Sequence, residues 1–105
     1  MNKPIVKRCE TMAEVRQHID ALDNRIVALL AERSGYVAQA ARIKQRADQI
    51  VDTARIDFIV DRVRALAREA GAPEAVMEVT YRTMIDAFIE FERSEFTRLK
   101  KGAGS

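Results

Sequence analysis

The apolar residues in the first half of the chain recur at the spacing of an amphipathic helix. They step by three and four along one face: Val15, Ile19, Leu22, Ile26 and Leu29/Leu30. Gly35 is the only glycine before Gly71, so no strong helix breaker lies between Glu10 and about Arg46. Thr11, with a glutamate three residues later, is typical of a capping box at a helix start. The pattern therefore predicts one long helix of some 35 residues.

A second helix is expected after the polar segment "RADQIVD", which reads as a loop. Asp52 or Thr53 is a suitable N-cap for this helix. Its apolar positions again follow helical spacing: Ile56, Ile59/Val60, Val63, Leu66/Ala67 and Ala70. Gly71 is suited to the C-terminal stop, because glycine readily adopts the left-handed conformation found there.

Pro73 fits the first turn of a third helix, which is expected to run to about Lys100. No segment alternates as a strand does, and no internal repeat is visible. The sequence thus predicts a single all-α domain, residues 1–105, with its core over about 10–100 and a flexible tail at 101–105.

The length of the first helix predicts an assembly. A helix of that size is roughly 50 Å long, whereas a compact chain of this length has a radius of gyration near 13 Å. Two shorter helices cannot cover so long an apolar face, but a second copy of the chain can. We expect an intertwined homodimer. The alternative is a helix broken at Ser34-Gly35, which would give a four-helix monomer.

Composition excludes several classes of function. The net charge is +2, and charges of both signs are interspersed without a basic block, which argues against a nucleic-acid partner. No apolar run is long enough for a signal peptide or a membrane span, so no membrane association is expected. Cys9 is the only cysteine, so no internal disulfide can form. A cytoplasmic protein is the simplest interpretation.

Two cations occupy positions where the helical pattern calls for leucine. Arg33 and Lys44 lie eleven residues apart, about three turns, so they project from nearly one face of the first helix. A buried charge without a partner is costly. Each cation therefore extends outward to solvent, pairs with a carboxylate such as Asp23, Asp48 or Glu92, or binds an anion.

Glu92 is a second anomaly, because it interrupts an apolar stripe on the third helix. The stripe consists of Ile85, Phe88, Glu92, Phe96 and Leu99. Arg55 at the start of the second helix and Arg16 early in the first complete a candidate cluster. Arg16 is about 40 Å from Lys44 along the same helix, so it can join the cluster only across a dimer interface. The cluster favours a small anion with several charges, held between helices.

The order of these elements resembles the all-helical chorismate mutase family over nearly all of residues 10–100. The resemblance rests on "VRQHIDALDNRIVALLAER", which ends at Arg33, on the later "ARIK" that ends at Lys44, and on the "D-x-x-R" formed by Asp52 and Arg55. Glu92 matches a Gln or Glu of the family on the last helix. The resemblance implies a three-helix chain in an intertwined dimer whose active sites are shared.

The resemblance also implies a reaction and roles. The reaction is the Claisen rearrangement of chorismate, a dianion, to prephenate, and it needs no covalent intermediate, metal or cofactor. Arg33, and Arg16 from the partner chain, would bind the two carboxylates of the substrate. Lys44 and Glu92 would donate hydrogen bonds to the ether oxygen of the breaking C–O bond.

On the ring side, Arg55 would hold the substrate, with Asp52 near the ring hydroxyl and Phe88 in the wall of the site. Ile56 is a departure, because mutases of the family typically carry a glutamate there. That difference resembles the related isochorismate-pyruvate lyases, which release pyruvate and leave salicylate. Lyase activity is therefore the second candidate function. A third is a non-catalytic helical dimerisation or regulatory module, which predicts no enclosed cavity.

Overall fold

The computed structural model describes residues 3–104, and within this range the secondary structure is entirely helical. The elements are α1 (Met12–Ile43), the short 3-10 helix η1 (Ala47–Gln49), α2 (Thr53–Ala70) and α3 (Glu74–Gly104). The predicted all-α class and the three long helices are confirmed. Across the described residues, no helix combines the length and the apolar character needed to cross a membrane.

Helix α1 begins where the capping pattern predicted. The Thr11 side chain accepts a hydrogen bond from the Glu14 backbone N–H at 3.2 Å, which satisfies one of the free amides of the first turn. The helix continues for 32 residues without interruption at Gly35, so the broken-helix alternative is wrong. It ends at Ile43 rather than near Arg46, because Lys44 adopts an extended conformation (ψ 140°) as the C-cap.

Both ends of α2 and the start of α3 lie where the sequence predicted them. Asp52 is the N-cap of α2 and accepts a hydrogen bond from the Arg55 backbone N–H. Gly71 ends the helix in the left-handed conformation (φ 73°), which glycine adopts without steric cost. Pro73 directly precedes α3. This helix continues to Gly104 rather than to about Lys100, since the two lysines before Gly102 are good helix formers and suit the negative end of the helix dipole.

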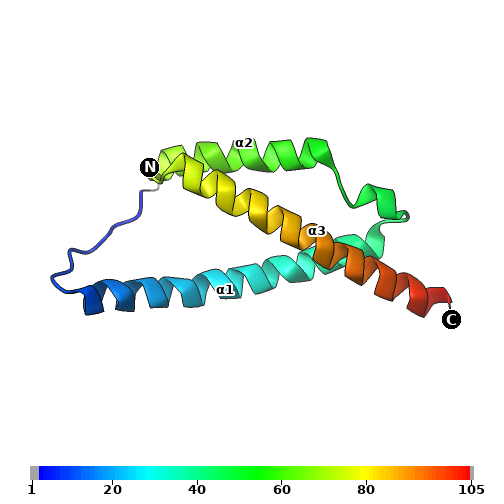
Figure 1. Ribbon diagram of the computed structural model, residues 1–105, viewed down its shortest axis with the longest axis horizontal. Coiled ribbons are helices and arrows are strands. Elements are labelled where there is room, and N and C mark those ends of the chain that lie inside the picture. Colours follow the sequence, from blue (N-terminus) through cyan, green and yellow to red (C-terminus); the bar gives the residue numbers. More distant parts are fainter. Residues whose placement is uncertain (1–2, 105) are drawn as a thin grey trace.

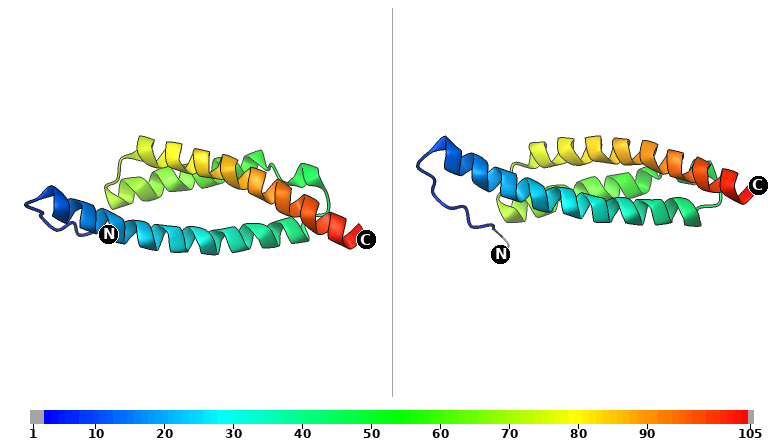
Figure 2. Two further views of the ribbon diagram at one scale, coloured as in Figure 1. Left: turned by 60° about the horizontal axis from the view of Figure 1, so that its bottom comes forward. Right: turned by 90° about the horizontal axis from the view of Figure 1, so that it is seen from below.

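The three long helices form an open fork rather than a compact bundle. Helix α3 packs against both α1 and α2. It runs from the turn after α2 across the C-terminal part of α1 (Figure 1), and α1 and α2 both lie below it in the right-hand view of Figure 2. The chain measures 60 × 27 × 20 Å and has a radius of gyration of 17.6 Å, well above the ~13 Å of a compact chain of this length. Its buried apolar residues are few: Ala41, Ile50, Val60, Ala67 and Ile85. Many apolar side chains on α1 are instead half exposed or more.

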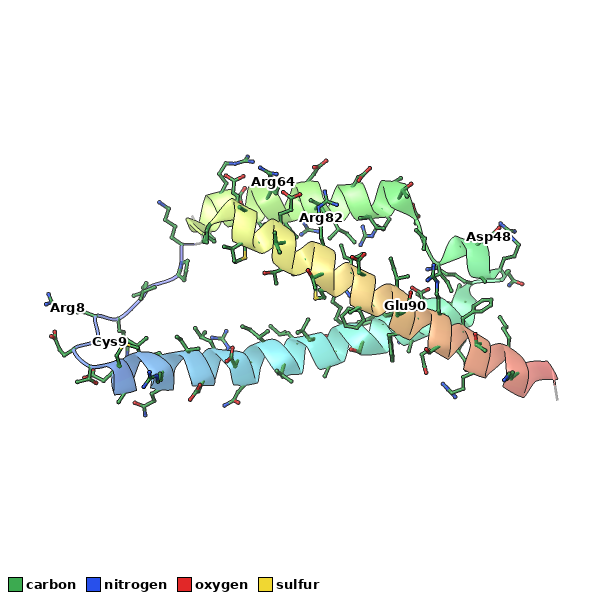
Figure 3. The ribbon with its side chains drawn as sticks, viewed as in Figure 1. Arg8, Cys9, Asp48, Arg64, Arg82 and Glu90 are labelled. Atoms are coloured by element: carbon green, nitrogen blue, oxygen red, sulfur yellow. The ribbon has the colours of Figure 1, made fainter. Side chains whose placement is uncertain are left out.

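An N-terminal arm, residues 3–10, precedes α1 without regular secondary structure. It extends from the start of α1 toward the turn between α2 and α3, where the Lys3 side chain lies beside Gly71 (Figure 1). Arg8 and Cys9 lie near the α1 end of this arm (Figure 3). Ile5 is 95% exposed, so the arm does not pack into the core of its own chain.

Ion pairs connect the far ends of α2 and α3. Glu78 pairs with Arg82 on its own helix at 2.8 Å and with Arg64 of α2 at 2.5 Å; Figure 3 shows both arginines at this junction. Arg68 binds Glu74 at 3.1 Å. The hydrogen bond from Arg82 lowers the pKa of Glu78, and that from Arg68 lowers the pKa of Glu74. Arg64 and Arg68 thus link α2 to α3 at the end away from the site, whereas the Arg82 pair lies within α3.

Candidate functional site

A pocket of about 290 Å³ lies where the C-terminal end of α1, η1, the start of α2 and the middle of α3 meet. Seven of the eight residues that the sequence singled out for the site line it: Arg33, Lys44, Asp52, Arg55, Ile56, Phe88 and Glu92. They come from positions up to 59 residues apart (92 − 33), so the fold, and not local sequence, brings them together.

Lys44 and Glu92 form the innermost pair of this pocket. The Lys44 ammonium nitrogen donates to Glu92 Oε2 at 2.6 Å. Glu92 is only 7% exposed, and the extended backbone of Lys44 at the end of α1 turns its chain out of the helix. Lys44 therefore pairs with Glu92, one of the three carboxylates expected as partners for the cations. Asp48 binds Arg46 instead and projects from η1, away from the pocket (Figure 3).

Arg33 enters the pocket from α1 and lies over an aromatic ring. Its guanidinium carbon is 4.7 Å from the centre of the Phe88 ring, a favourable cation–π distance. Its Nη1 atom is buried, and none of the described residues accepts a hydrogen bond from it. A buried guanidinium N–H without an acceptor is costly, so this atom marks the place where an anion would be stabilised.

The start of α2 forms the outer rim. Asp52 lines the pocket and accepts a hydrogen bond from the Arg55 backbone N–H through Oδ1 at 3.0 Å. The Arg55 guanidinium is stacked over Phe58, 5.2 Å from the ring centre. Ile56 is half-buried and contributes an apolar surface. The rim thus offers one cation, one anion and one apolar side chain.

Arg16 is the one predicted site residue that the chain does not bring to the pocket. It lies near the opposite end of α1, exposed, 17 residues (33 − 16) before Arg33. At 1.5 Å per residue this is a separation of about 25 Å along a continuous helix. Within one chain, therefore, Arg16 cannot reach the cluster.

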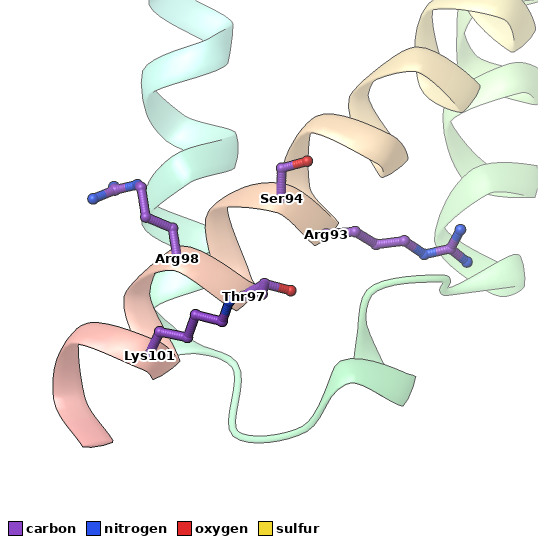
Figure 4. Close-up of a pocket in the computed structure, with 5 residues that line it drawn as sticks. All are labelled: Arg93, Ser94, Thr97, Arg98 and Lys101. Atoms are coloured by element: carbon purple, nitrogen blue, oxygen red, sulfur yellow. The ribbon is translucent and has the colours of Figure 1, made fainter. Parts of the chain in front are cut away.

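A larger depression, about 530 Å³, lies on the C-terminal part of α3 (Figure 4). It is lined by residues of that one helix: Arg93, Ser94, Thr97, Arg98 and Lys101. Arg93 already binds Glu90, and Arg98 binds Glu95, both as exposed pairs within one helix. With its arginines engaged and no second element forming a wall, this surface is a weaker candidate site despite its size.

Sequence reasoning missed several pocket residues. They are Val37, Gln49, Ile50, Ile59 and Ile89, and Ile85 was noted only as part of the α3 stripe. Helical spacing was a usable signal for most of them, since Val37 lies four residues after Arg33 and Ile59 three after Ile56. Gln49 lies in the connection between α1 and α2, where no periodicity points to it.

Comparison with known proteins agrees with this geometry. Residues 15–93 match the family model of chorismate mutase type II. The chain is also similar to a chorismate mutase of Methanocaldococcus jannaschii, with 36% identity over 78 residues, covering 73% of this chain and 79% of that protein. The match extends from the first turn of α1 to the residue after Glu92, and so includes every residue of the pocket. The resemblance seen in the sequence is confirmed: this chain belongs to the type II chorismate mutase family.

Proposed function

We propose that the protein is a chorismate mutase that converts chorismate to prephenate. In this rearrangement the ether C–O bond breaks while a new C–C bond forms within the same molecule. Six electrons move in a ring, no group leaves, and nothing is oxidised or reduced. The protein therefore needs only to hold the folded conformer of the substrate and to stabilise the charge that develops on the ether oxygen.

The observation that carries this proposal is the unsatisfied Nη1 of Arg33. Lys44 has a carboxylate partner, but the buried Arg33 N–H has no acceptor in the described chain. A substrate carboxylate bound there would supply the missing acceptor in a charge-assisted hydrogen bond. Phe88 under the guanidinium restricts its orientation and so prepares the site for that carboxylate.

Lys44 and Glu92 are the proposed catalytic residues. Their polar atoms meet at 2.6 Å inside the pocket, so both can reach one substrate atom placed between them. The ammonium group donates a hydrogen bond to the ether oxygen, and Glu92 donates a second one when it carries a proton. Both bonds strengthen as the C–O bond breaks, because negative charge then accumulates on that oxygen.

We further propose that the active protein is an intertwined homodimer. The extended shape of the chain and the exposed apolar side chains of α1 support it, because Leu22, Leu29, Tyr36 and Ile43 are between 50% and 64% exposed. These four recur every seven residues, a spacing that suits packing of α1 against α1 of a second copy. Such a dimer would carry Arg16 of each chain to the pocket of the other, where it would bind the second carboxylate.

Isochorismate-pyruvate lyase activity is a second candidate, and Ile56 favours it. An apolar side chain lines the pocket where mutases of the family typically have a glutamate for the ring hydroxyl. Asp52 on the same rim is a carboxylate that could accept a hydrogen bond from the ring hydroxyl, which supports the mutase assignment. The third candidate, a non-catalytic module, predicts charges that are at the surface or paired with one another, and no enclosed cavity. The Lys44–Glu92 pair is compatible with it. The buried Arg33 Nη1 argues against it, because none of the described residues accepts a hydrogen bond from this atom.

The decisive experiment offers chorismate and isochorismate separately to the purified protein. Prephenate from chorismate is the expected product. Salicylate and pyruvate from isochorismate, without prephenate from chorismate, would replace the mutase assignment with the lyase. Absence of turnover of both substrates by a folded dimer would exclude both enzymes.

A further inference from the structure

The Gln49 side chain closes the turn that directly follows Lys44. Its amide oxygen accepts a hydrogen bond from the Gln45 backbone N–H at 2.8 Å and another from the Arg46 backbone N–H at 3.0 Å. These are the first two amides after the C-cap of α1, and neither continues the helix. Because both donors are backbone N–H groups, the atom that faces them must be the amide oxygen and not the nitrogen.

This contact directly follows Lys44, whose own N–H still bonds Ala40 O of α1 at 3.0 Å. Lys44 leaves the helix with an extended backbone, so the last turn of α1 alone does not fix the path of the chain beyond it. On the far side of the turn, Ile50 is 5% exposed and anchors the segment in the core. Between Lys44 and Ile50, backbone hydrogen bonds join Gln49 N–H to Arg46 O and Ile50 N–H to Ala47 O, both at 3.1 Å. The Gln49 amide oxygen adds the two bonds that hold the first residues after Lys44, Gln45 and Arg46.

The side chain of Gln49 also borders the pocket itself, next to Lys44 and Asp52. Its oxygen is directed toward the turn, so its NH₂ group is the part left for the pocket. A substitution that keeps an oxygen acceptor but removes the NH₂ group therefore separates support of the turn from contact with the substrate.

We propose that Gln49 is a positioning residue, which holds the Lys44 ammonium group against Glu92 by capping the turn after α1. The expected effect of Gln49 on kcat rests on the proposed function. The restraint that Gln49 places on the turn does not depend on that function. An exposed pair of hydrogen bonds contributes little to global stability. Misplacing a catalytic group by about 1 Å, in contrast, can cost about 10²-fold in rate.

The test compares Gln49→Ala, Gln49→Glu and the control Gln45→Ala. Gln45 is a glutamine of the same turn whose backbone, and not its side chain, makes the contact. Gln49→Ala should lower kcat by about tenfold to 10²-fold. Gln49→Glu keeps an oxygen acceptor and should recover most of kcat, while its negative charge beside the anionic substrate should raise KM. Gln45→Ala should behave as the wild type. Gln49 is exposed, so these variants should fold.

Two further measurements separate positioning from a general structural effect. Amide hydrogen exchange at Gln45 and Arg46 should accelerate in Gln49→Ala while exchange in α2 stays unchanged. In a double-mutant cycle, Gln49→Ala should lower kcat far less in the Lys44→Ala background than in the wild type, because Gln49 acts through Lys44. Unchanged kcat in Gln49→Ala, unchanged exchange, or full additivity would overturn the proposal. If the wild type rearranges no chorismate, the proposed function fails, and the exchange data still decide whether Gln49 holds the turn.

Discussion

The ammonium nitrogen of Lys44, at the end of α1, lies 2.6 Å from Oε2 of Glu92 in the middle of α3. The two residues are 48 positions apart, and each breaks an apolar pattern on its own helix. Without substrate they neutralise each other, so the pocket can keep both polar groups in place at a tolerable cost. When an ether oxygen enters between them, each is already within reach of it.

Lys44→Ala should lower kcat by about 10²–10³-fold, since it removes a donor at the atom where charge develops. Arg93→Ala is the matched control, because it also deletes one cation, from a pair on the surface of α3. It should alter kcat by less than about threefold. Steady-state kinetics with chorismate provide the comparison, and similar mild losses in both variants would place the site elsewhere.

Glu92→Gln should remain active, because the Gln amide keeps a hydrogen-bond donor of similar shape beside the ether oxygen. Glu92→Ala removes the donor and should lower kcat by about 10²-fold. The measurement is kcat of both variants with chorismate. An inactive Gln variant that still folds and dimerises, or an Ala variant as active as the Gln variant, would refute the donor role of Glu92.

Ile56→Glu should shift preference toward chorismate. The side chain borders the pocket, and a carboxylate at this position could accept a hydrogen bond from the ring hydroxyl. We expect the ratio of kcat/KM for chorismate over isochorismate to rise about tenfold, corresponding to one new hydrogen bond of about 1.4 kcal/mol. Ala54→Glu, at an exposed position of the same turn that does not line the pocket, is the control for a new charge. An unchanged ratio in Ile56→Glu would mean that position 56 only fills space.

Subunit exchange tests the shared site. Arg16→Ala and Lys44→Ala homodimers should both be nearly inactive. In a heterodimer of the two, one pocket carries both defects and the other carries neither. Mixing the variants under exchange conditions should therefore restore activity in proportion to the amount of heterodimer formed. One of the two pockets in each heterodimer should be active. Exchange demonstrated by mass spectrometry without recovery of activity would show that Arg16 works in its own chain or not at all.

The α2–α3 ion pairs should make stability depend on pH in acid. The pKa values of Glu74 and Glu78 are lowered in the folded state by hydrogen bonds from Arg68 and Arg82 respectively. Their stabilisation is therefore complete above the unfolded-state value near 4.5 and is lost as pH falls through the lower folded-state values. These groups are at the surface, so added salt should weaken the effect.

The measurement is the urea midpoint of unfolding between about pH 2.5 and 7, at low and high salt. Arg82→Gln should flatten the acid limb of this curve. Arg62→Gln is the control, because Arg62 is an exposed cation of α2 that is not among the arginines paired with Glu74 or Glu78. Equal flattening by both substitutions would indicate a general effect of net charge instead of these pairs.

The site could be predicted from the sequence wherever a charged residue interrupts a helical pattern. Arg33 and Glu92 occupy core-facing positions of long helices, where geometry is regular enough for spacing alone to predict direction. Lys44 was expected on the helix and instead ends it, yet its long side chain still reaches the pocket. A difference of about three residues (46 − 43) in the helix end thus had little effect on the predicted site.

The turn between α1 and α2 could not be predicted in the same way. Gln49 reaches the pocket because of a 3-10 turn and two side-chain hydrogen bonds, which no periodic pattern encodes. The role of Arg16 and the dimer stay predictions for a related reason. Exposed apolar residues on α1 indicate that a partner covers this face, but they do not identify that partner.

The unbroken course of α1 also constrains which insertions and deletions evolution can accept. In the proposed dimer the same rigid rod carries Arg33 for one pocket and Arg16 for the other. One inserted residue between them would rotate one arginine by about 100° relative to the other, and would disable both pockets at once. Seven inserted residues would restore the direction but move the pockets apart by about 10 Å. Relatives of this chain should therefore vary in length in the arm, in the turns and beyond α3, and hold the seventeen-residue interval constant.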